Sequence, residues 1–189
     1  QSTRVFYNTD EDFERGGRDL YAKVRQQGIG SIESFWRRKN GQPFQVLITA
    51  CAMDPSDPIL ITFTISDITE LKQAQGRVNM LSQAIEQSPV AVVVTDTKGA
   101  IEYVNPRFTE LTGYEASDVM GRNPRILKSK NTSREEYAEL WKIISAGGQW
   151  QGQFLNRKKN GQYYWELSSI SPIRNEHGVI THFVAVKED

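Results

Sequence analysis

Residues that could ligate a metal ion or attack a substrate are few in this sequence. Its 189 residues include two histidines and one cysteine. A single cysteine, Cys51, excludes an internal disulfide and any cysteine-rich zinc site. A haem would need an axial ligand, usually histidine, but His177 lies in an Asn-Glu-His-Gly loop, where a solvated side chain is the simpler interpretation. Because phosphate-binding loops and nucleophile motifs are also missing, we expect neither an enzyme nor a metal site.

Charge and hydropathy argue against two classes of partner. Lysines and arginines number 23, as do aspartates and glutamates, so the formal net charge is zero. This balance does not favour nucleic acid or an anionic membrane surface. The longest apolar run, residues 90–94, is far too short to span a bilayer, and the polar first stretch does not resemble a signal peptide. We therefore expect a cytoplasmic location, and the start at Gln1 suggests a fragment of a longer protein.

An internal repeat organises the chain. The tetrapeptide Lys-Asn-Gly-Gln at 39–42 returns at 159–162. Two further matches occur at nearly the same spacing, between residues 2–6 and 123–127 and between residues 65–67 and 187–189. Residues 1–69 are therefore predicted to be a second copy of the back half of a module, and the complete copy of that module spans residues 88–189.

Periodicity and turn residues predict the elements of the complete copy. A β-branched run at 90–95 and an alternating run at 101–104 are typical of paired strands, since a turn of sequence Asp-Thr-Lys-Gly follows the first. Asn105 can cap a short helix, and Ser133 with Glu136 forms a capping-box pattern at the start of a longer one. Three more strands are expected near residues 149–157, 162–172 and 179–187. This order predicts an α+β fold, a five-stranded antiparallel sheet with helices on one face.

Residues 67–87, between the two copies, are predicted to form a linker helix. Apolar and small polar residues alternate three and four positions apart, as in a coiled-coil seam: Ile68, Leu71, Gln75, Val78, Ser82 and Ile85. Gly76 weakens this seam. Two interpretations stay open, because the stripe can pack on the flanking units or pair with a second copy in a parallel homodimer.

The complete copy resembles a PAS domain over its full length. The matching stretches occur in the family's order: VTDTKGAIEYVNPRFTELTGY, GRNPRIL and RKKNGQYYWELSSISPIRNEHG. The Asp-Ile-Thr at 67–69 resembles the strand end that leads PAS domains into an output helix. The resemblance implies the PAS fold, in tandem with a partial PAS unit, and a sensory role in signal transduction. An output domain, such as a histidine kinase or a diguanylate cyclase, would lie elsewhere in the same parent chain.

Within this family, the sequence is similar to flavin-binding redox sensors of the NifL and MmoS type. Light-sensing LOV domains carry a reactive cysteine after the Gly-Arg-Asn of this loop, but Pro124 stands at that position, which excludes a flavin–cysteine adduct. The resemblance places at the flavin a tryptophan of the long helix and an asparagine opening the next strand, here Trp141 and Asn156. An aromatic ring can pack against the cofactor, and an amide both donates and accepts at its polar edge.

The resemblance implies these cofactor-binding residues: Trp141, Asn156, Asn123, Glu166 and Leu127. It implies FAD as the cofactor, with FMN or no cofactor as alternatives. Trp141 also lies on an apolar helix stripe, so ordinary core packing is the alternative for that residue. Lys187 stands where LOV domains use a glutamine against the flavin edge. The rival function is a ligand-free PAS module that dimerises and relays strain.

The first copy is expected to hold no cofactor, because it carries Trp36 near the position of Asn156 and lacks a complete pocket wall. It also lacks the two front strands, so a strand edge and a core face are expected to need cover. The apolar residues assigned to that face are Phe35, Trp36, Phe44, Val46, Ile48, Ile61 and Phe63. The front half of the first copy or a second chain would cover them.

Overall fold

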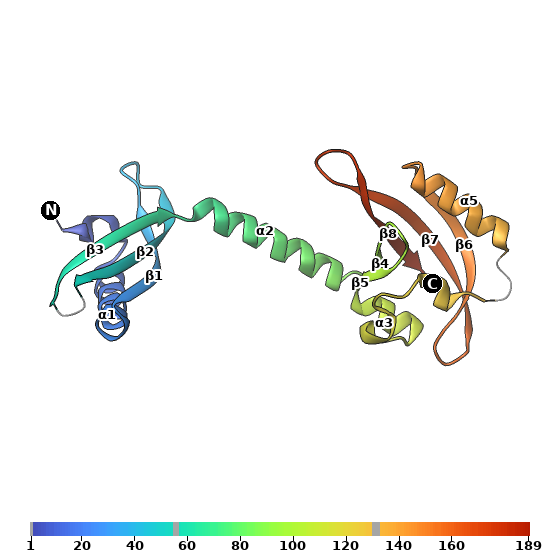
Figure 1. The fold of residues 1–189 in the computed structure, drawn as a ribbon, viewed down its shortest axis with the longest axis horizontal. Helices are drawn as coiled ribbons and strands as arrows, with labels where there is room; N and C mark the ends of the chain where they lie inside the picture. Colours follow the sequence, from blue (N-terminus) through green and yellow to red (C-terminus); the bar gives the residue numbers. More distant parts are fainter. Residues whose placement is uncertain (1, 55–56, 130–132) are drawn as a thin grey trace. The chain divides into compact units, whose positions relative to one another are not determined.

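A computed structural model describes residues 2–54, 57–129 and 133–189, in two units, Gln1–Asn79 and Met80–Asp189 (Figure 1). The second unit contains a five-stranded sheet. Its strands are β4 (Ala91–Asp96), β5 (Ile101–Val104), β6 (Trp150–Arg157), β7 (Tyr163–Arg174) and β8 (Ile180–Glu188). Every pair is antiparallel and the order is β5-β4-β8-β7-β6, so the first strand lies beside the last. This arrangement confirms the predicted fold class.

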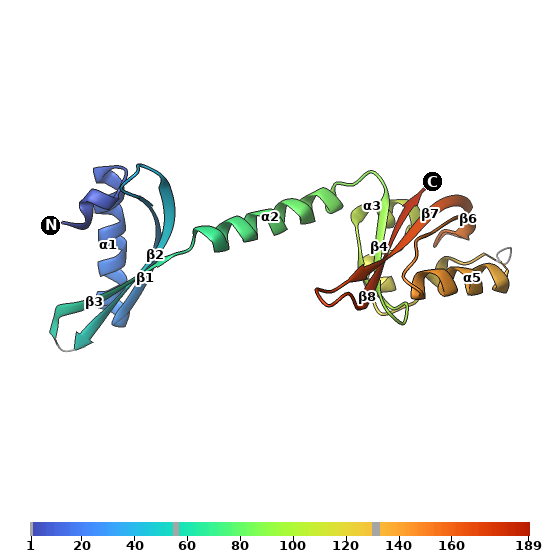
Figure 2. The ribbon, with the colours of Figure 1, turned by 90° about the horizontal axis from the view of Figure 1, so that it is seen from above.

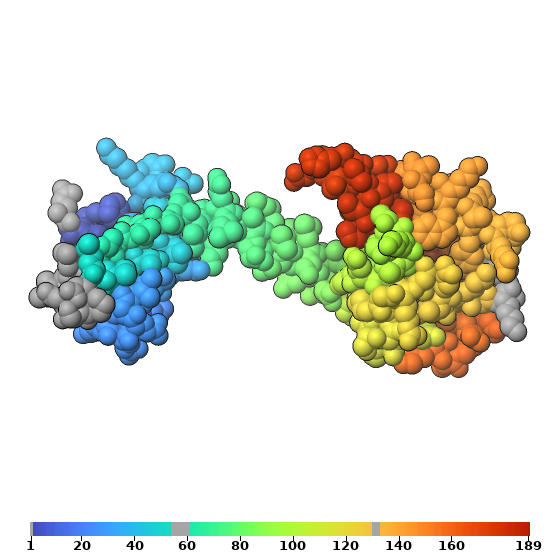
Figure 3. Space-filling model, in the orientation of Figure 1, coloured from blue at the N-terminus to red at the C-terminus, as the bar shows by residue number. Residues whose placement is uncertain are grey.

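Between β5 and β6 the described residues form helical segments that cover one face of the sheet. They are α3 (Pro106–Thr112), α4 (Ala116–Val119), the 3-10 turn η2 (Pro124–Leu127) and α5 (Arg134–Ser145). Figure 2 shows α5 running beside β6 and β7. In the space-filling view the shorter segments, in yellow, pack against the yellow-green β4–β5 hairpin (Figure 3).

The helix starts follow from the capping residues that the sequence predicts. Asn105 caps α3 and its side chain accepts a hydrogen bond from the Phe108 amide, while Pro106 occupies the first helical position. Ser133 and Glu136 form the reciprocal capping box of α5. These caps set where each helix begins, and therefore which side chains face the sheet.

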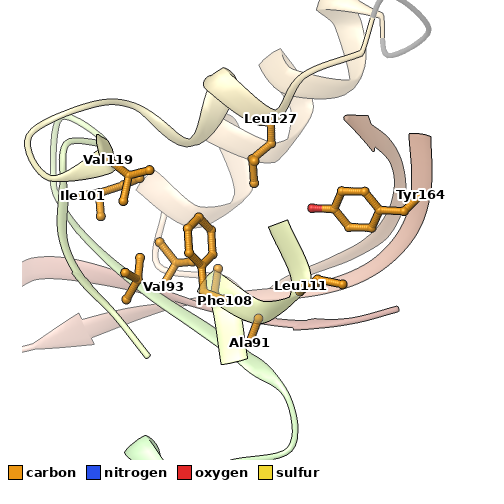
Figure 4. Close-up of a cluster of buried hydrophobic side chains, with 10 residues drawn as sticks. Ala91, Val93, Ile101, Phe108, Leu111, Val119, Leu127 and Tyr164 are labelled. Carbon is orange, nitrogen blue, oxygen red and sulfur yellow. The ribbon is translucent and has the colours of Figure 1, made fainter. Parts of the chain in front are cut away.

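The main core of the second unit lies between the sheet and the shorter helical segments (Figure 4). Val93 and Ile101 of the hairpin meet Phe108 and Val119, and all four are at most 1% exposed. Burying each such side chain stabilises the fold by roughly 1.5–3 kcal/mol. Leu127 belongs to this cluster and is equally buried.

The first unit contains one long helix and a three-stranded sheet. Its elements are η1 (Thr3–Phe6), α1 (Asp10–Gln27), β1 (Ile29–Arg37), β2 (Pro43–Asp54) and β3 (Asp57–Asp67). The strand order is β1-β2-β3, so β3 pairs on one side only, whereas its counterpart β8 pairs on both. An edge strand of this kind keeps unpaired backbone groups along its free side.

The sheet face of the first unit is better covered than expected. Trp36, Val46 and Ile48 are buried in one cluster with residues of α1, which supplies much of the missing cover. The assignment of Phe35 to this face was wrong, because strand alternation turns it to the opposite face, where it is 55% exposed. Phe63 of β3 shares the covered face but remains 45% exposed, since α1 packs on β1 and β2.

The residues predicted to form a linker form helix α2 (Thr69–Glu86), none of which is buried. At its end, the Tyr103 hydroxyl donates to Glu86 over 2.6 Å, and Asn105 Nδ2 donates to the Ile85 carbonyl over 3.1 Å. The last turn of α2 is thereby bonded to the β4–β5 hairpin of the second unit.

Among the described residues, no helix combines the length and the apolar character that a membrane span requires.

Candidate functional site

A cavity of about 390 Å³ lies between α5 and the helix-covered face of the sheet in the second unit. Its floor is built by β4, β6, β7 and β8, and one wall by the α5 residues from Arg134 to Ile144. The 3-10 turn η2 contributes Pro124 and Arg125 at another side. Small-molecule pockets in proteins have volumes of roughly 300–1,000 Å³, so this cavity has the size of a binding site.

Aromatic rings line much of the cavity. Trp141 of α5 meets Phe183 of β8 edge to face, with ring centroids 5.7 Å apart. Tyr137 stacks on Phe154 at 5.5 Å. These pairs hold the rings in place, and together they offer an apolar surface to a flat ligand.

Asn123 and Gly99 close one corner of the cavity. Asn123 Nδ2 donates to the Gly99 carbonyl over 2.9 Å, and its Oδ1 accepts from the Arg125 amide and guanidinium. Gly99 has φ +81°, and a Cβ there would lie 2.6 Å from Asn123 Nδ2 and 3.0 Å from Trp141. The corner therefore requires glycine, and the Asn123 amide is largely engaged within the protein.

Asn156 lines the cavity from β6 and is 4% exposed. It lies second from the end of β6, not at the strand opening as the sequence comparison implied. Its side chain interacts with the Tyr164 hydroxyl on the neighbouring strand and partly offsets the rise in the pKa of that hydroxyl. A carboxamide has more hydrogen-bonding capacity than this one contact uses, so Asn156 can serve a ligand as well.

Glu166 is fully buried behind the cavity lining, at the centre of a polar network. It accepts from Lys187 Nζ over 2.5 Å, from Ser168 Oγ over 2.6 Å and from the Tyr164 hydroxyl over 3.0 Å. Burial raises the pKa of Glu166, but the charge of Lys187 and the three hydrogen bonds together bring it below its ordinary value. Burial, with the Glu166 charge, raises the pKa of Tyr164, so its hydroxyl remains a donor.

Cations surround the cavity. Among the described residues that line it are Arg125, Lys128 and Arg134, in addition to Lys187, and no aspartate or glutamate. Lys128 lies over the Tyr137 ring, 4.7 Å from its centroid, and an isolated β-bridge pairs it with Asn156. A lining of this charge suits a ligand that carries an anionic group.

The predicted site residues fall into two groups. Trp141, Asn156 and Asn123 line the same cavity, whereas Glu166 and Leu127 do not. Glu166 holds Lys187 from behind, and Leu127 packs in the main core. The predicted set omitted several lining residues: Thr95, Phe183, Arg125, Lys128 and Arg134; it also omitted Lys187, although the resemblance places that residue at the flavin edge. Strand alternation could have indicated Phe183 and Lys187, which lie four residues apart on one face of β8.

The first unit has a different set of residues at the matching sheet positions. Trp36 pairs with Phe44 in β1–β2 as Asn156 pairs with Tyr164 in β6–β7. Trp36 is 6% exposed, and its indole nitrogen has no hydrogen-bond partner within the described residues. Phe6 stacks on it at 4.9 Å. Aromatic side chains fill this place, so the position that matches Asn156 carries no comparable polar group among the described residues of the first unit.

Comparison with known sequences identifies the class of protein to which this fold and cavity belong. Residues 79–189 match the PAS fold family and residues 3–70 match a PAS domain family. The first match alone covers more than half of the chain, which therefore belongs to the PAS family, the sensory modules of signalling proteins.

Curated relatives include regulators and light receptors. The chain is 36% identical over 105 residues to the nitrogen fixation regulatory protein of Klebsiella oxytoca, covering 56% of this chain and 21% of that protein. It is 31% identical over 114 residues to a blue-light-activated histidine kinase of Brucella anthropi, covering 59% of this chain and 23% of that protein. The chain thus spans about a fifth of the length of these relatives.

Solved structures show the same fold. An RNA-binding light-oxygen-voltage receptor superposes with a TM-score of 0.56 at 16% identity, covering 96% of this chain and 83% of that chain. The light-state structure of the Aureochrome1 LOV domain gives a TM-score of 0.50 at 27% identity, covering 59% of this chain and 87% of that chain.

Proposed function

We propose that the complete PAS module binds a flavin nucleotide, FAD in the first instance, as a redox sensor. It would report its state through a helix to an output domain elsewhere in the parent protein. The single observation that carries the proposal is the cavity beneath α5, which combines aromatic walls, a few buried polar groups and a cationic lining. The similarity to the Klebsiella regulator supports a regulatory role for the parent protein.

The residues of the cavity fit the chemical parts of a flavin. A flat ring system needs apolar walls, which Trp141 and Phe183 supply, and a polar edge needs both donors and acceptors, which Asn156 supplies. Phosphate groups need cations, and Arg125 and Lys128 stand at the cavity. When bound, a flavin supplies reversible uptake of electrons.

The chain's own residues determine which flavin chemistry is open. Pro124 lines the cavity and offers no thiol. The cysteine of this chain, Cys51, is exposed in the first unit and is distant in sequence from the residues that line the cavity. A light-driven cysteine adduct is therefore excluded, which favours a change of redox state as the signal. Phe183 is buried and Trp141 is half-buried, so these rings would shield part of a bound flavin from water and from side reactions.

The test is the absorption spectrum of the whole chain after incubation with FAD and removal of unbound cofactor. We expect the two flavin bands in the near ultraviolet and the blue, with no bleaching under blue light. Asn156→Ala should lower the bound fraction, because one good hydrogen bond contributes about 0.5–1.5 kcal/mol, equivalent to an affinity loss of roughly two- to tenfold. The matched control is Asn79→Ala on exposed helix α2, which should bind as the wild type does.

A folded chain that retains no FAD or FMN would overturn the proposal. The alternative, a ligand-free module that dimerises, draws on a separate observation. Helix α2 leaves Leu71 66%, Val78 60% and Ile85 41% exposed, as expected of a seam that pairs with a second copy. Sedimentation of the chain with and without Val78→Glu distinguishes this function, because only a dimer held by α2 would dissociate in the variant.

A further inference from the structure

A buried ion pair lies behind the cavity, and only its cation faces the ligand space. Lys187 lines the cavity, whereas Glu166 does not. The two groups are 2.5 Å apart, and their side chains are 7% and 0% exposed. The pair carries no net charge, but its positive end is the nearer one to the cavity. Negative charge placed in the cavity is therefore stabilised.

The orientation of the pair is fixed by its neighbours. Glu166 accepts hydrogen bonds from Ser168 and Tyr164 in addition to Lys187, so its carboxylate is held from three sides. Lys187 stands opposite Ser168 in the β7–β8 register and opposite Ala91 in the β4–β8 register. A charge that is held in place before a ligand binds acts on it without a cost of reorganisation.

The fold itself does not require these polar residues. The strand registers and the repeat align each of them with an apolar residue of the first unit: Glu166 with Val46, Ser168 with Ile48 and Lys187 with Ile65. Val46 and Ile48 are buried in the core of that unit. Ile65 lies on the edge strand β3 and is 48% exposed, so apolar side chains occupy all three matching positions in the sheet of the first unit, although the third is not buried.

Stability does not explain the pair either. Removing two charges from water is costly, and replacing a buried ion pair by well-packed apolar residues is often neutral or stabilising. The described residues contain eight ion pairs, and in the other seven both side chains are at least one-third exposed. The buried pair is the one that adjoins the cavity, which points to a role toward the ligand.

We infer that the Lys187–Glu166 pair raises the reduction potential of a flavin held in the cavity, because it stabilises the negative charge that reduction adds. The inference rests on the proposed function. Two electrons and one proton convert the neutral oxidised ring into a reduced ring with one negative charge. The electrons come from a low-potential donor, which is dithionite in the assay below and is itself oxidised to sulfite.

The two partners act in opposite directions, which makes the inference testable by sign. The ammonium of Lys187 stabilises negative charge in the cavity, whereas the carboxylate of Glu166, farther back, offsets part of that effect. Lys187→Met keeps most of the side-chain volume and removes the cation. Glu166→Gln keeps hydrogen-bonding capacity and removes the anion.

The experiment measures the midpoint potential of FAD bound to the whole chain, by titration with dithionite against a reference dye. Lys187→Met should lower the midpoint potential by at least about 30 mV. For a two-electron couple this shift corresponds to a tenfold loss in the affinity for reduced FAD relative to oxidised FAD. Glu166→Gln should raise it. The control Lys142→Met, on the exposed side of α5, should leave it unchanged.

The result separates this inference from the proposed function. Shifts of opposite sign in Lys187→Met and Glu166→Gln support the inference, because a general loosening of the site would move both variants in one direction. Bound FAD with an unchanged potential, or shifts of the same sign, would overturn it and leave the proposed function standing. A folded wild-type chain that binds no flavin would overturn both. If Lys187→Met does not fold, Glu166→Gln alone still decides the sign.

Discussion

Replacing Lys187 by methionine should destabilise the second unit in a way that depends on pH. The side chain of Glu166 is fully buried, and in the wild type it has Lys187 as its cationic partner. The variant leaves the carboxylate with the hydrogen bonds from Ser168 and Tyr164 only. Burial is the largest influence on the pKa of Glu166 and raises it, so loss of the cation should move that pKa above its ordinary value of 4.5.

The magnitude follows from the work of keeping this carboxyl protonated. In the unfolded chain Glu166 ionises near its ordinary pKa of 4.5. Each pH unit above that value costs about 1.36 kcal/mol if the folded variant stays protonated, so the loss reaches about 3 kcal/mol near pH 7. This lies at the low end of the roughly 3–5 kcal/mol expected when one partner of a buried ion pair is removed.

The pH dependence has opposite signs in the two proteins. In the wild type the lowered pKa of Glu166 contributes stability that is present above pH 4.5 and is lost as pH falls through the folded-state pKa. In the variant the raised pKa imposes a penalty that is absent below about pH 4.5 and grows as pH rises toward the new folded-state value. The variant's penalty should therefore shrink to about 1 kcal/mol near pH 5, and the difference between the two proteins should narrow with it.

Urea unfolding of the apo chain across this pH range measures the effect. Tryptophan fluorescence follows the second unit, because Trp141, Trp150 and Trp165 lie there and only Trp36 lies in the first. The double variant Glu166→Val, Lys187→Ile copies the apolar residues of the first unit and should recover most of the lost stability. A penalty independent of pH, or a double variant no more stable than Lys187→Met, would refute the reasoning.

Two further substitutions test other parts of the second unit. Asn105→Ala removes a buried side chain that makes four hydrogen bonds of 2.8–3.1 Å. It should lower the free energy of unfolding of the second unit by about 3 kcal/mol. Ser133→Ala, which removes an exposed helix cap, should lower it by only about 1 kcal/mol. Equal losses in urea unfolding would contradict the role given to Asn105. Gly99→Ala should lower the stability of the second unit by more than the roughly 1–2 kcal/mol that a left-handed backbone costs a residue with a Cβ, because this Cβ also meets Asn123. The variant should retain less FAD. The control is Gly161→Ala, because Gly161 has φ +91° and a Cβ there would meet open space. This variant should lose only the roughly 1–2 kcal/mol of the left-handed backbone and should bind FAD normally. Equal losses of stability in the two variants would show that the contact at Gly99 is unimportant.

Local signals in the sequence predicted the elements well. The cap at Asn105 and the capping box at Ser133 start α3 and α5 where expected, because capping depends on residues only a few positions apart. The antiparallel neighbours β4–β5, β6–β7 and β7–β8 also followed, since alternating apolar residues and short turns favour such pairs. Such features need no knowledge of distant parts of the chain.

The inner details of the site depended on contacts that are distant in sequence. Glu166 was assigned to the ligand pocket because the resemblance to flavin-binding PAS modules places a polar side chain there. Its place behind Lys187 follows from the β7–β8 register, which contains an irregularity between Ile173 and Arg174 that short-range patterns do not reveal. Leu127 turned into the core because η2 is a 3-10 turn, whose side-chain directions follow no strand or α-helix period.

The two units differ in how soon each sheet can form during synthesis. In the first unit the strand order β1-β2-β3 follows the chain, so each strand pairs with the one made just before it. In the second unit the central pair joins Ala91 of β4 to Lys187 of β8, across nearly the whole unit. Pairing of such distant residues slows folding, because loop closure must precede the contacts that reward it. On the ribosome, β4 must therefore wait with one edge unpaired until residue 187 has emerged, while the first unit has already folded.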